Sequence, residues 1–386
     1  MKRPIYLDYN STTPVDPRVL EAMLPYFTEV FGNPASKNHI YGNEAFKAVE
    51  DARETIAKAI KARTQEVIFT SGATEAINLA IKGVAIANRA RGRHFITVAT
   101  EHKAVLDCYE WLVANGFEAT ILPVNADGLL DPLEVAGAIR PDTILVSVMA
   151  ANNEIGVIQP LKEIGSICRD KNVYFMTDAT QALGKIPLDV QALQVDLLAA
   201  SGHKVYGPKG IGFLYVRRSN PRVVIEPIIH GGGHEKGLRS GTLATPNIVG
   251  LARAVEIAVE EMPKEQERLR KLRDQLLESL LAAIPEAKVN GSMEQRLVSN
   301  LNMVFPGVES EALMIALKSE IAVSSGSACT TAAVLPSHVL KALGLSDRQS
   351  YSSIRIGLGR FTDQGDLAQA AERVACELKR LSGFHA

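Results

Sequence analysis

The sequence predicts an α/β protein with a mostly parallel, helix-covered sheet and a second, smaller α+β unit. Between residues 46 and 216, short apolar runs alternate with longer segments of helical period, a pattern typical of such a sheet. After residue 283 this alternation gives way to isolated strands and helices. A chain of 386 residues also exceeds the size at which one hydrophobic core usually stops growing, so we expect two domains.

Each expected element follows from the period of its apolar residues. The apolar runs that predict strands lie at 66–70, 95–99, 119–123, 143–148, 173–177 and 195–200. The segments that predict helices lie between them, at 46–62, 74–90, 103–115, 131–139 and 160–171. A long charged helix is expected at 246–283, and it could bridge the domains. The smaller unit should contain a strand at 297–305, a helix at 310–318, a loop of small residues at 324–333, a strand at 352–358 and a closing helix.

Composition narrows the possible functions. The 42 basic and 43 acidic residues nearly cancel, and no long run of one sign suggests a nucleic-acid or membrane surface, so the expected substrate is small. No apolar stretch reaches membrane-spanning length and no signal-peptide pattern opens the chain, which predicts a cytoplasmic protein. The four cysteines lack metal-ligand or disulfide spacing and should be free thiols. Three of them, Cys108, Cys168 and Cys376, fall in amphipathic helical patterns and are expected to be buried.

Lys204 follows directly on the apolar run 195–200, where an ammonium ion needs a partner or a lowered pKa. A Schiff base with an aldehyde cofactor removes that difficulty. Asp178 ends the run before it, so a carboxylate should lie at the carboxyl end of a neighbouring parallel strand, where open α/β sheets bind ligands. A carboxylate there keeps a pyridine nitrogen protonated. Taken alone, Lys204 could be an edge lysine reaching water and Asp178 a helix cap, but the pair favours a pyridoxal cofactor.

Two segments have the composition of anion sites. The turn TSGATE at 70–75 joins a predicted strand to a predicted helix, and amides and hydroxyls at a helix start suit a phosphate, although an ordinary capped helix start is equally consistent. The Gly-rich segment at 231–242 could approach a phosphate or a neighbouring subunit closely. Its flanking His230 and His234 lack further ligands at metal spacing, so no metal site is expected. The HGGG at 230–233 resembles an esterase motif, but no serine has glycine at both the −2 and +2 positions.

Cys329 lies in SSGSACTTAA at 324–333, a run of small residues without apolar period. Such a run predicts an open loop rather than a core element. Because an accessible thiol can act as a nucleophile, we interpret Cys329 as functional rather than as an incidental exposed cysteine.

These motifs together resemble the NifS/IscS-type cysteine desulfurases, a group of class-V aminotransferase-like, fold type I pyridoxal-phosphate enzymes. The resemblance runs nearly end to end. Its motifs are LDYNSTTP at 7–14, FGNPAS at 31–36, TSGATE at 70–75, TEHKAV at 100–105, NNEIG at 152–156, DATQ at 178–181, SGHK at 201–204, HGGGH at 230–234, RSGT at 239–242, SSGSAC at 324–329 and SIR at 353–355.

The resemblance implies a fold and a set of residue roles. The fold would be a large domain with a mostly parallel seven-stranded sheet at 14–255, and a small α+β domain formed by 1–13 and 256–386 that carries the cysteine loop at about 324–336. Around the cofactor ring it implies Lys204 as the Schiff-base lysine, Asp178 at the pyridine nitrogen, His102 on the ring face and as a proton acceptor, and Gln181 and Asn153 near the phenolic oxygen and the substrate. Around the phosphate it implies Ala73, Thr74, Ser201 and His203, with Thr242 reaching the phosphate from the second subunit of a homodimer. Arg355 would bind the substrate carboxylate, and Cys329 would be the sulfur acceptor.

The implied reaction converts L-cysteine to L-alanine and leaves a persulfide on Cys329, which passes the sulfur to an iron–sulfur scaffold or another carrier. The SSGSAC motif is typical of the long-loop class of these enzymes. Bacterial housekeeping members of this family dock the scaffold through a tail beyond the last helix, whereas this chain ends at Ala386 soon after its last predicted helix, so the resemblance leaves scaffold docking open. Alternatives are a selenocysteine lyase, an aminotransferase, which would not need the thiol, and a non-catalytic sulfur carrier.

Overall fold

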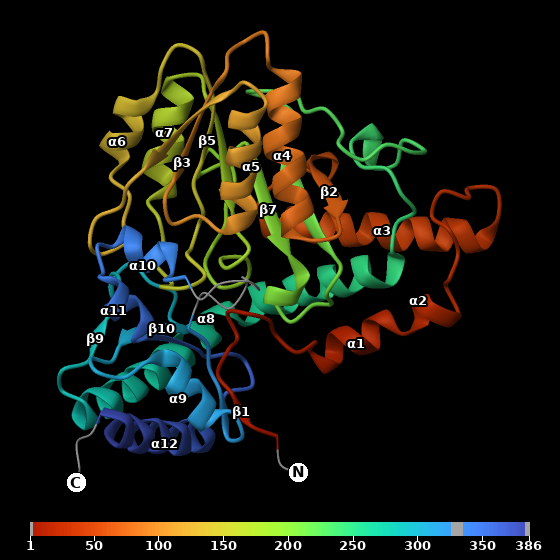
Figure 1. The fold of residues 1–386 in the computed structure, drawn as a ribbon. Coiled ribbons are helices and arrows are strands. Elements are labelled where there is room, and N and C mark those ends of the chain that lie inside the picture. Colours follow the sequence, from red (N-terminus) through yellow and green to blue (C-terminus); the bar gives the residue numbers. More distant parts are fainter. Residues whose placement is uncertain (1–2, 326–334, 383–386) are drawn as a thin grey trace.

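The computed structural model describes residues 3–325 and 335–382. Its main sheet has seven strands in the order β2-β8-β7-β6-β5-β3-β4 (Figure 1). All neighbours are parallel except β8, which runs antiparallel to both β2 and β7. The strands are β2 (Val67–Thr70), β3 (His94–Val98), β4 (Glu118–Leu122), β5 (Thr143–Ser147), β6 (Tyr174–Asp178), β7 (Leu197–Ser201) and β8 (Gly212–Val216). The prediction of a mostly parallel sheet is confirmed, although β8 was not anticipated.

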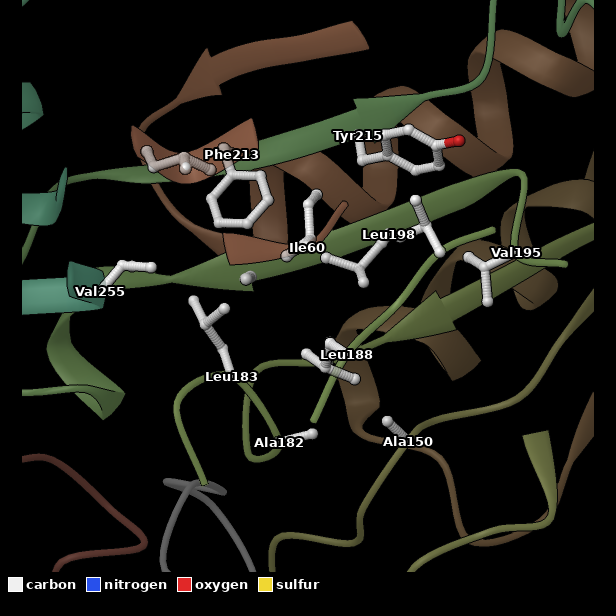
Figure 2. Close-up of a cluster of buried hydrophobic side chains, with 14 of the residues drawn as sticks. Ile60, Ala150, Ala182, Leu183, Leu188, Val195, Leu198, Phe213, Tyr215 and Val255 are labelled. Atoms are coloured by element: carbon white, nitrogen blue, oxygen red, sulfur yellow. The ribbon is translucent and has the colours of Figure 1, made fainter. Parts of the chain in front are cut away.

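Helices cover both faces of this sheet. One face packs against α4 (Ala73–Ala87) and α5 (Lys103–Ala114), and the other against α3 (Ile40–Ala59), α6 (Pro132–Ala138), α7 (Leu161–Asp170) and the first half of α8 (Thr245–Ala283). Successive strand residues alternate between the two cores, as Phe175 and Met176 of β6 do, because side chains on a strand point to opposite faces. Figure 2 shows part of the core on the α8 face, where Phe213 of the sheet lies near Val255 of α8.

The second unit has a separate core. An antiparallel sheet of β12 (Ser353–Gly357), β10 (Asn300–Val304) and β9 (Lys288–Val289) packs with α9 (Ser310–Leu317) and α12 (Gln364–Ser382). The second half of α8 contributes Leu269 to Leu280 to this core, whereas Ile248 to Ala258 belong to the first. Helix α8 therefore spans both units, as expected, and the predicted boundary at 255–256, which falls inside this helix, stays a prediction.

Short elements complete the chain. They are β1 (Ile5–Tyr6), paired in parallel with β11 (Ile321–Ala322), and the helices α1 (Pro17–Met23), α2 (Pro25–Thr28), α10 (His338–Ala342) and α11 (Asp347–Tyr351). Cys108 and Cys168 are buried, as expected, but the expectation that Cys376 is buried is wrong. Cys376 lies on the solvent side of α12, whose core side is formed by Ala370, Val374 and Leu378. No helix in the described ranges is long and apolar enough to cross a membrane.

The strand order brings several chain segments to one edge of the main sheet. Asp178 ends β6 and Ser201 ends β7, and His102 follows β3 after a short turn. Because parallel strands end at the same edge, residues far apart in the sequence meet there. At this edge Gly212 of β8 passes against the turn before α4. A Cβ atom at Gly212 would lie 2.4 Å from the Ala200 oxygen and 2.7 Å from the Gly72 Cα.

We predict that Gly212→Ala lowers the free energy of unfolding by about 1–3 kcal/mol, because both contacting groups are backbone that cannot move aside. Gly137, on the exposed side of α6, has nothing within 4 Å of a built Cβ atom. Gly137→Ala should therefore raise stability by up to about 1 kcal/mol through helix propensity. Thermal melting of both variants measures the difference, and equal melting temperatures would contradict the close approach at Gly212.

Candidate active site

A cavity of about 490 Å³ opens at the carboxyl edge of the main sheet. Most residues that the sequence singled out line it, although they come from six different segments of the chain. They are Ala73, Thr74, His102, Asn153, Asp178, Gln181, Ser201, His203, Lys204 and Arg355. Thr242 is exposed and does not line the cavity, and Cys329 lies outside the described residues.

Lys204 ends the 3₁₀ turn Gly202–Lys204, which follows directly on β7. Its Nζ donates to the backbone oxygen of Asn10 at 2.6 Å and also to that of Ser11. The N-terminal segment is in turn fixed to the same turn, since the Thr13 amide donates to the His203 oxygen at 2.9 Å. Residues 10–12 also line the cavity, although their role was not predicted. The unbroken polar run in the LDYNSTTP motif is the signal that could have identified them.

Asp178 and His102 lie on neighbouring walls. Asp178 is buried, and its Oδ1 accepts a hydrogen bond from the Thr180 amide at 2.9 Å. His102 caps α5, with Nδ1 accepting from the Ala104 amide at 3.1 Å. Burial lowers the pKa of His102, and Lys204 adds to this effect while Asp178 opposes it. The neutral ring with an acceptor Nδ1 carries its hydrogen on Nε2, so in this arrangement the imidazole donates to the cavity.

One end of the cavity has the features of a phosphate site. Helix α4 begins after Gly72, which provides no side-chain cap, and Ala73 and Thr74 of its first turn line the cavity. The Ser201 hydroxyl lies 3.7 Å from the position of a Cβ built on Gly72. Burial and the nearby lysines lower the pKa of His203 to about 4, so that imidazole is neutral. Helix amides, a hydroxyl and surrounding lysines together favour a bound dianion.

Three buried polar atoms at the cavity have no hydrogen-bond partner among the described residues. They are Asn153 Oδ1, Thr180 Oγ1 and Arg355 Nε. Arg355 otherwise donates to the Asn153 backbone oxygen at 3.0 Å and to Asp8 Oδ1 at 2.7 Å. Because buried polar groups are normally paired, these atoms indicate a polar ligand. A phosphate site, a carboxylate for a pyridine nitrogen, a lysine and a partly unpaired arginine fit pyridoxal phosphate with an amino-acid substrate.

The chain on either side of the cysteine-bearing segment is fixed at the rim of this cavity. Before it, Ser324 exchanges backbone hydrogen bonds with Arg355 at 2.7 and 3.3 Å. After it, Ser337 Oγ donates to Glu154 Oε2 at 2.5 Å, and His338 Nε2 contacts the backbone oxygen of Glu101 at 2.9 Å. Arg355 lines the cavity, and Glu101 and Glu154 are sequence neighbours of His102 and Asn153, so the described residues on both sides of the Cys329 segment lie beside the candidate site.

The Gly-rich segment that carries Thr242 is joined to the main domain by two ion pairs. Arg239 Nε lies 2.8 Å from Glu75 Oε1 in the first turn of α4. Glu235 forms a buried, bidentate pair with Arg53 of α3, at 2.7 and 2.8 Å. In the described part of the chain no cluster of His, Cys, Asp and Glu could hold a metal ion.

Glu101, a residue that sequence reasoning missed, lies directly before His102 and is completely buried. Its Oε1 accepts from the Met149 amide at 2.6 Å, while Oε2 has no partner among the described residues. Burial and the nearby carboxylate of Asp178 raise the pKa of Glu101 well above its ordinary value. Burial therefore favours the neutral acid form of Glu101, which lies directly before His102 in the chain.

Comparison with known proteins identifies the family. The aminotransferase class-V model matches residues 5–369. The chain is 56% identical over 381 residues to cysteine desulfurase IscS of Methylococcus capsulatus, and 54% identical to that of Neisseria meningitidis, covering 99% of this chain and 94% of each relative. A solved structure described as a NifS-like protein superposes with a TM-score of 0.92 at 39% identity, over 98% of this chain and 100% of the other. One described as SspA in complex with cysteine gives 0.81 at 40% identity, over 92% and 98%.

The chain therefore belongs to the aminotransferase class-V family and is a pyridoxal-phosphate-dependent enzyme. Within that family it is a cysteine desulfurase of the NifS/IscS type. The resemblance, the fold class and the cofactor predicted from the sequence are confirmed.

The titration of Glu101 gives a stability prediction. The native state retains a proton that the unfolded chain loses above the ordinary pKa of glutamate, so this residue lowers stability progressively as pH rises beyond that value. Glu101→Gln cannot lose a proton. Its free energy of unfolding should therefore rise relative to that of wild type as the pH is raised above about 5, by up to about 1.4 kcal/mol per pH unit, and melting temperatures measured over that range show the rise.

Glu75→Gln is the matched control of opposite sign. Burial disfavours the Glu75 carboxylate, but hydrogen bonds from Arg239 and Ser71 outweigh it and lower the pKa of Glu75. Glu75→Gln should consequently be less stable than wild type near neutral pH and approach it as pH falls below the ordinary glutamate value. If Glu101→Gln gained nothing on raising the pH while Glu75→Gln behaved as described, the protonated state of Glu101 would be refuted.

Proposed function

We propose that this enzyme converts L-cysteine to L-alanine at the cavity and holds the released sulfur as a persulfide on Cys329. The observation that carries this is the anchoring of both ends of the cysteine-bearing segment beside the cavity, through Ser324 on Arg355 and Ser337 on Glu154. A solved relative is described as a complex with cysteine, and curated relatives carry the name cysteine desulfurase, which supports this substrate.

Different residues around the cavity bind different parts of the cofactor and the substrate. Lys204 would hold the cofactor through its aldehyde, and its Nζ would carry the substrate α-proton. Ala73, Thr74, Ser201 and His203 hold the phosphate, Asp178 keeps the pyridine nitrogen protonated, and His102 stacks on the ring. Pyridoxal phosphate supplies an electron sink for the carbanion that forms when the α-proton leaves. Gln181 and Asn153 contact the phenolic oxygen and the substrate.

Arg355 binds the substrate carboxylate. Its guanidinium already engages Asp8 and the Asn153 oxygen, and its buried Nε has no partner among the described residues. A carboxylate at this point pairs with a fixed, planar donor group. It also lies beside Ser324, where the cysteine-bearing segment begins.

Sulfur transfer then balances without an external oxidant. The Cys329 thiolate attacks the substrate sulfur, an S–S bond forms, and the bond from that sulfur to the substrate Cβ breaks. The electron pair of the broken bond stays with the three-carbon fragment, which is protonated and leaves as alanine. The thiolate requires a proton acceptor, and His102 is proposed for this role, in which its Nδ1 would exchange the hydrogen bond from the Ala104 amide for the thiol proton. Delivery of the persulfide sulfur to an iron–sulfur scaffold or another carrier, in the cytoplasm, stays a prediction.

We further propose a homodimer. Helices α1 to α3 project from the body of the molecule, next to the Gly-rich segment (Figure 1). These helices and the loop between α2 and α3 expose several large apolar side chains, among them Phe31 of the loop at 63% and Ile40 of α3 at 65%. An apolar surface of this kind in one region indicates a protein interface. Thr242 is exposed and outside its own cavity, which leaves it available to the phosphate of a second subunit.

The central prediction concerns the two reactive side chains. With L-cysteine and a thiol reductant, the wild-type enzyme should release equal amounts of alanine and sulfide. Cys329→Ser should lower the rate of both by at least about 100-fold, because removing a covalent nucleophile removes a transition-state interaction. Lys204→Ala should abolish turnover and the cofactor absorbance near the blue edge of the visible. Absorbance spectra and paired alanine and sulfide assays measure these effects.

Release of sulfur by Cys329→Ser at the wild-type rate would refute the persulfide route. Selenocysteine as substrate separates the lyase alternative, because a lyase would retain selenide release in Cys329→Ser while losing little activity. A non-catalytic carrier would bind sulfur without forming alanine, and its spectrum would not depend on Lys204.

The dimer is tested by charge substitution in the apolar surface. Phe31→Glu should shift the sedimentation coefficient from that of a dimer toward that of a monomer, because an unpaired carboxylate would be buried in the interface. Leu133→Glu, at an even more exposed apolar position on α6, serves as the matched control and should remain dimeric. Dissociation of both variants, or of neither, would argue against this surface as the interface.

A further inference from the structure

Lys185 is a second lysine near the site, and the proposed function does not use it. It lies in the turn after β6, four residues beyond Gln181, and its Nζ donates to Gln181 Oε1 at 3.1 Å. Burial, followed by the nearby Lys204, lowers the pKa of Lys185 to about 7. Within the described residues it forms no salt bridge with a carboxylate. Glu265 lines the same small cavity as Lys185 and Lys204, but it pairs with Arg360 at 2.6 Å.

The hydrogen bonds of Gln181 explain what the donor Lys185 Nζ contributes at this position. Its Oε1 has two acceptor positions, which receive Lys185 Nζ and Asn10 Nδ2 at 3.1 and 3.3 Å. Its Nε2 has two N–H groups, and one donates to the Asn10 backbone oxygen at 2.8 Å. One N–H therefore remains, on a side chain that lines the active-site cavity. A rotated amide would place its oxygen at the Asn10 carbonyl and, while Lys185 is protonated, its nitrogen at an ammonium group, so that both contacts would be repulsive.

We propose that Lys185 is a positioning residue that fixes the orientation of the Gln181 amide, so that its remaining N–H is donated to the bound cofactor or substrate. The inference rests on the proposed use of the cavity and adds a residue to it. Lys185 itself does not line that cavity. It acts from behind Gln181, and no contact between Lys185 and a ligand is required.

A role in fold stability and a role in positioning Gln181 predict different results for Lys185→Met. The first would appear in the apoenzyme, and the second only in the bound cofactor. A buried ammonium costs stability, and a methionine of similar length would fill the same space without that cost. Lys185→Met should therefore leave the apoenzyme at least as stable as wild type. A positioning role instead affects the bound cofactor. Loss of an N–H donated to the phenolic oxygen, together with loss of a neighbouring positive charge, should raise the pH midpoint of the cofactor absorbance.

The test compares holoenzymes by absorbance titration. Lys185→Met should raise the midpoint by roughly half a pH unit or more, the size expected for one neutral hydrogen bond. Gln181→Ala should raise it similarly. In the Gln181→Ala background, Lys185→Met should add less than half of its single effect, because two residues that act through one contact are not additive. Lys162→Met, an exposed lysine substitution on α7, should leave the midpoint unchanged.

Two results would overturn the proposal. One is an unchanged midpoint in Lys185→Met, and the other is a full shift from Lys185→Met when Gln181 is already alanine, which would mean that the charge acts without the amide. Failure of the proposed function is distinguishable from both, because in that case the wild-type absorbance would not depend on Lys204 and no titration of any variant would report on the cavity.

Discussion

The backbone oxygen of Asn10 is the point on which the arrangement of the site depends. It accepts hydrogen bonds from Lys204 Nζ and from Gln181 Nε2, which come from different strand ends. The Asn10 side chain reaches the second unit, since its Oδ1 accepts from Asn300 of β10 at 3.4 Å. One residue of the N-terminal segment thus links the cofactor lysine, a cavity amide and the smaller sheet. Such a buried link is stable only while every polar group in it is paired.

Charged groups are unevenly distributed around the cavity. Lys204, Lys209 and the neutral His203 surround the end where α4 begins, which favours the phosphate. Asp178 and Glu101 are buried, and burial raises the pKa of Glu101 well above its ordinary value. Arg355 and the beginning of the cysteine-bearing segment share the opposite rim. In the proposed function, the positions of these charged groups, and not the shape of the cavity alone, would separate the phosphate, the ring and the substrate carboxylate.

The sequence was most informative where one residue type allows few explanations. Lys204 after a buried strand and Asp178 at the end of the neighbouring one predicted the cofactor correctly, because a desolvated lysine and a carboxylate at strand ends have few other uses. It was less informative for residues that act on other residues. Glu101, Asn10 and Lys185 belong to quoted motifs or lie next to them, but only three-dimensional contacts show what they hold. Strand β8 escaped prediction because its apolar run follows a Gly- and Pro-rich turn without an intervening helix.

The sequence by itself determined the alternation of strands and helices, the α/β class and the family, because these depend on local period and on short motifs. The tertiary structure alone decided that β8 is antiparallel, that Cys376 faces solvent while Cys108 and Cys168 do not, and that Ser324 and Ser337 flank one cavity. The physical reason is that burial and hydrogen-bond partners depend on contacts between residues up to 347 positions apart, as between Asp8 and Arg355. Local sequence patterns do not encode such contacts.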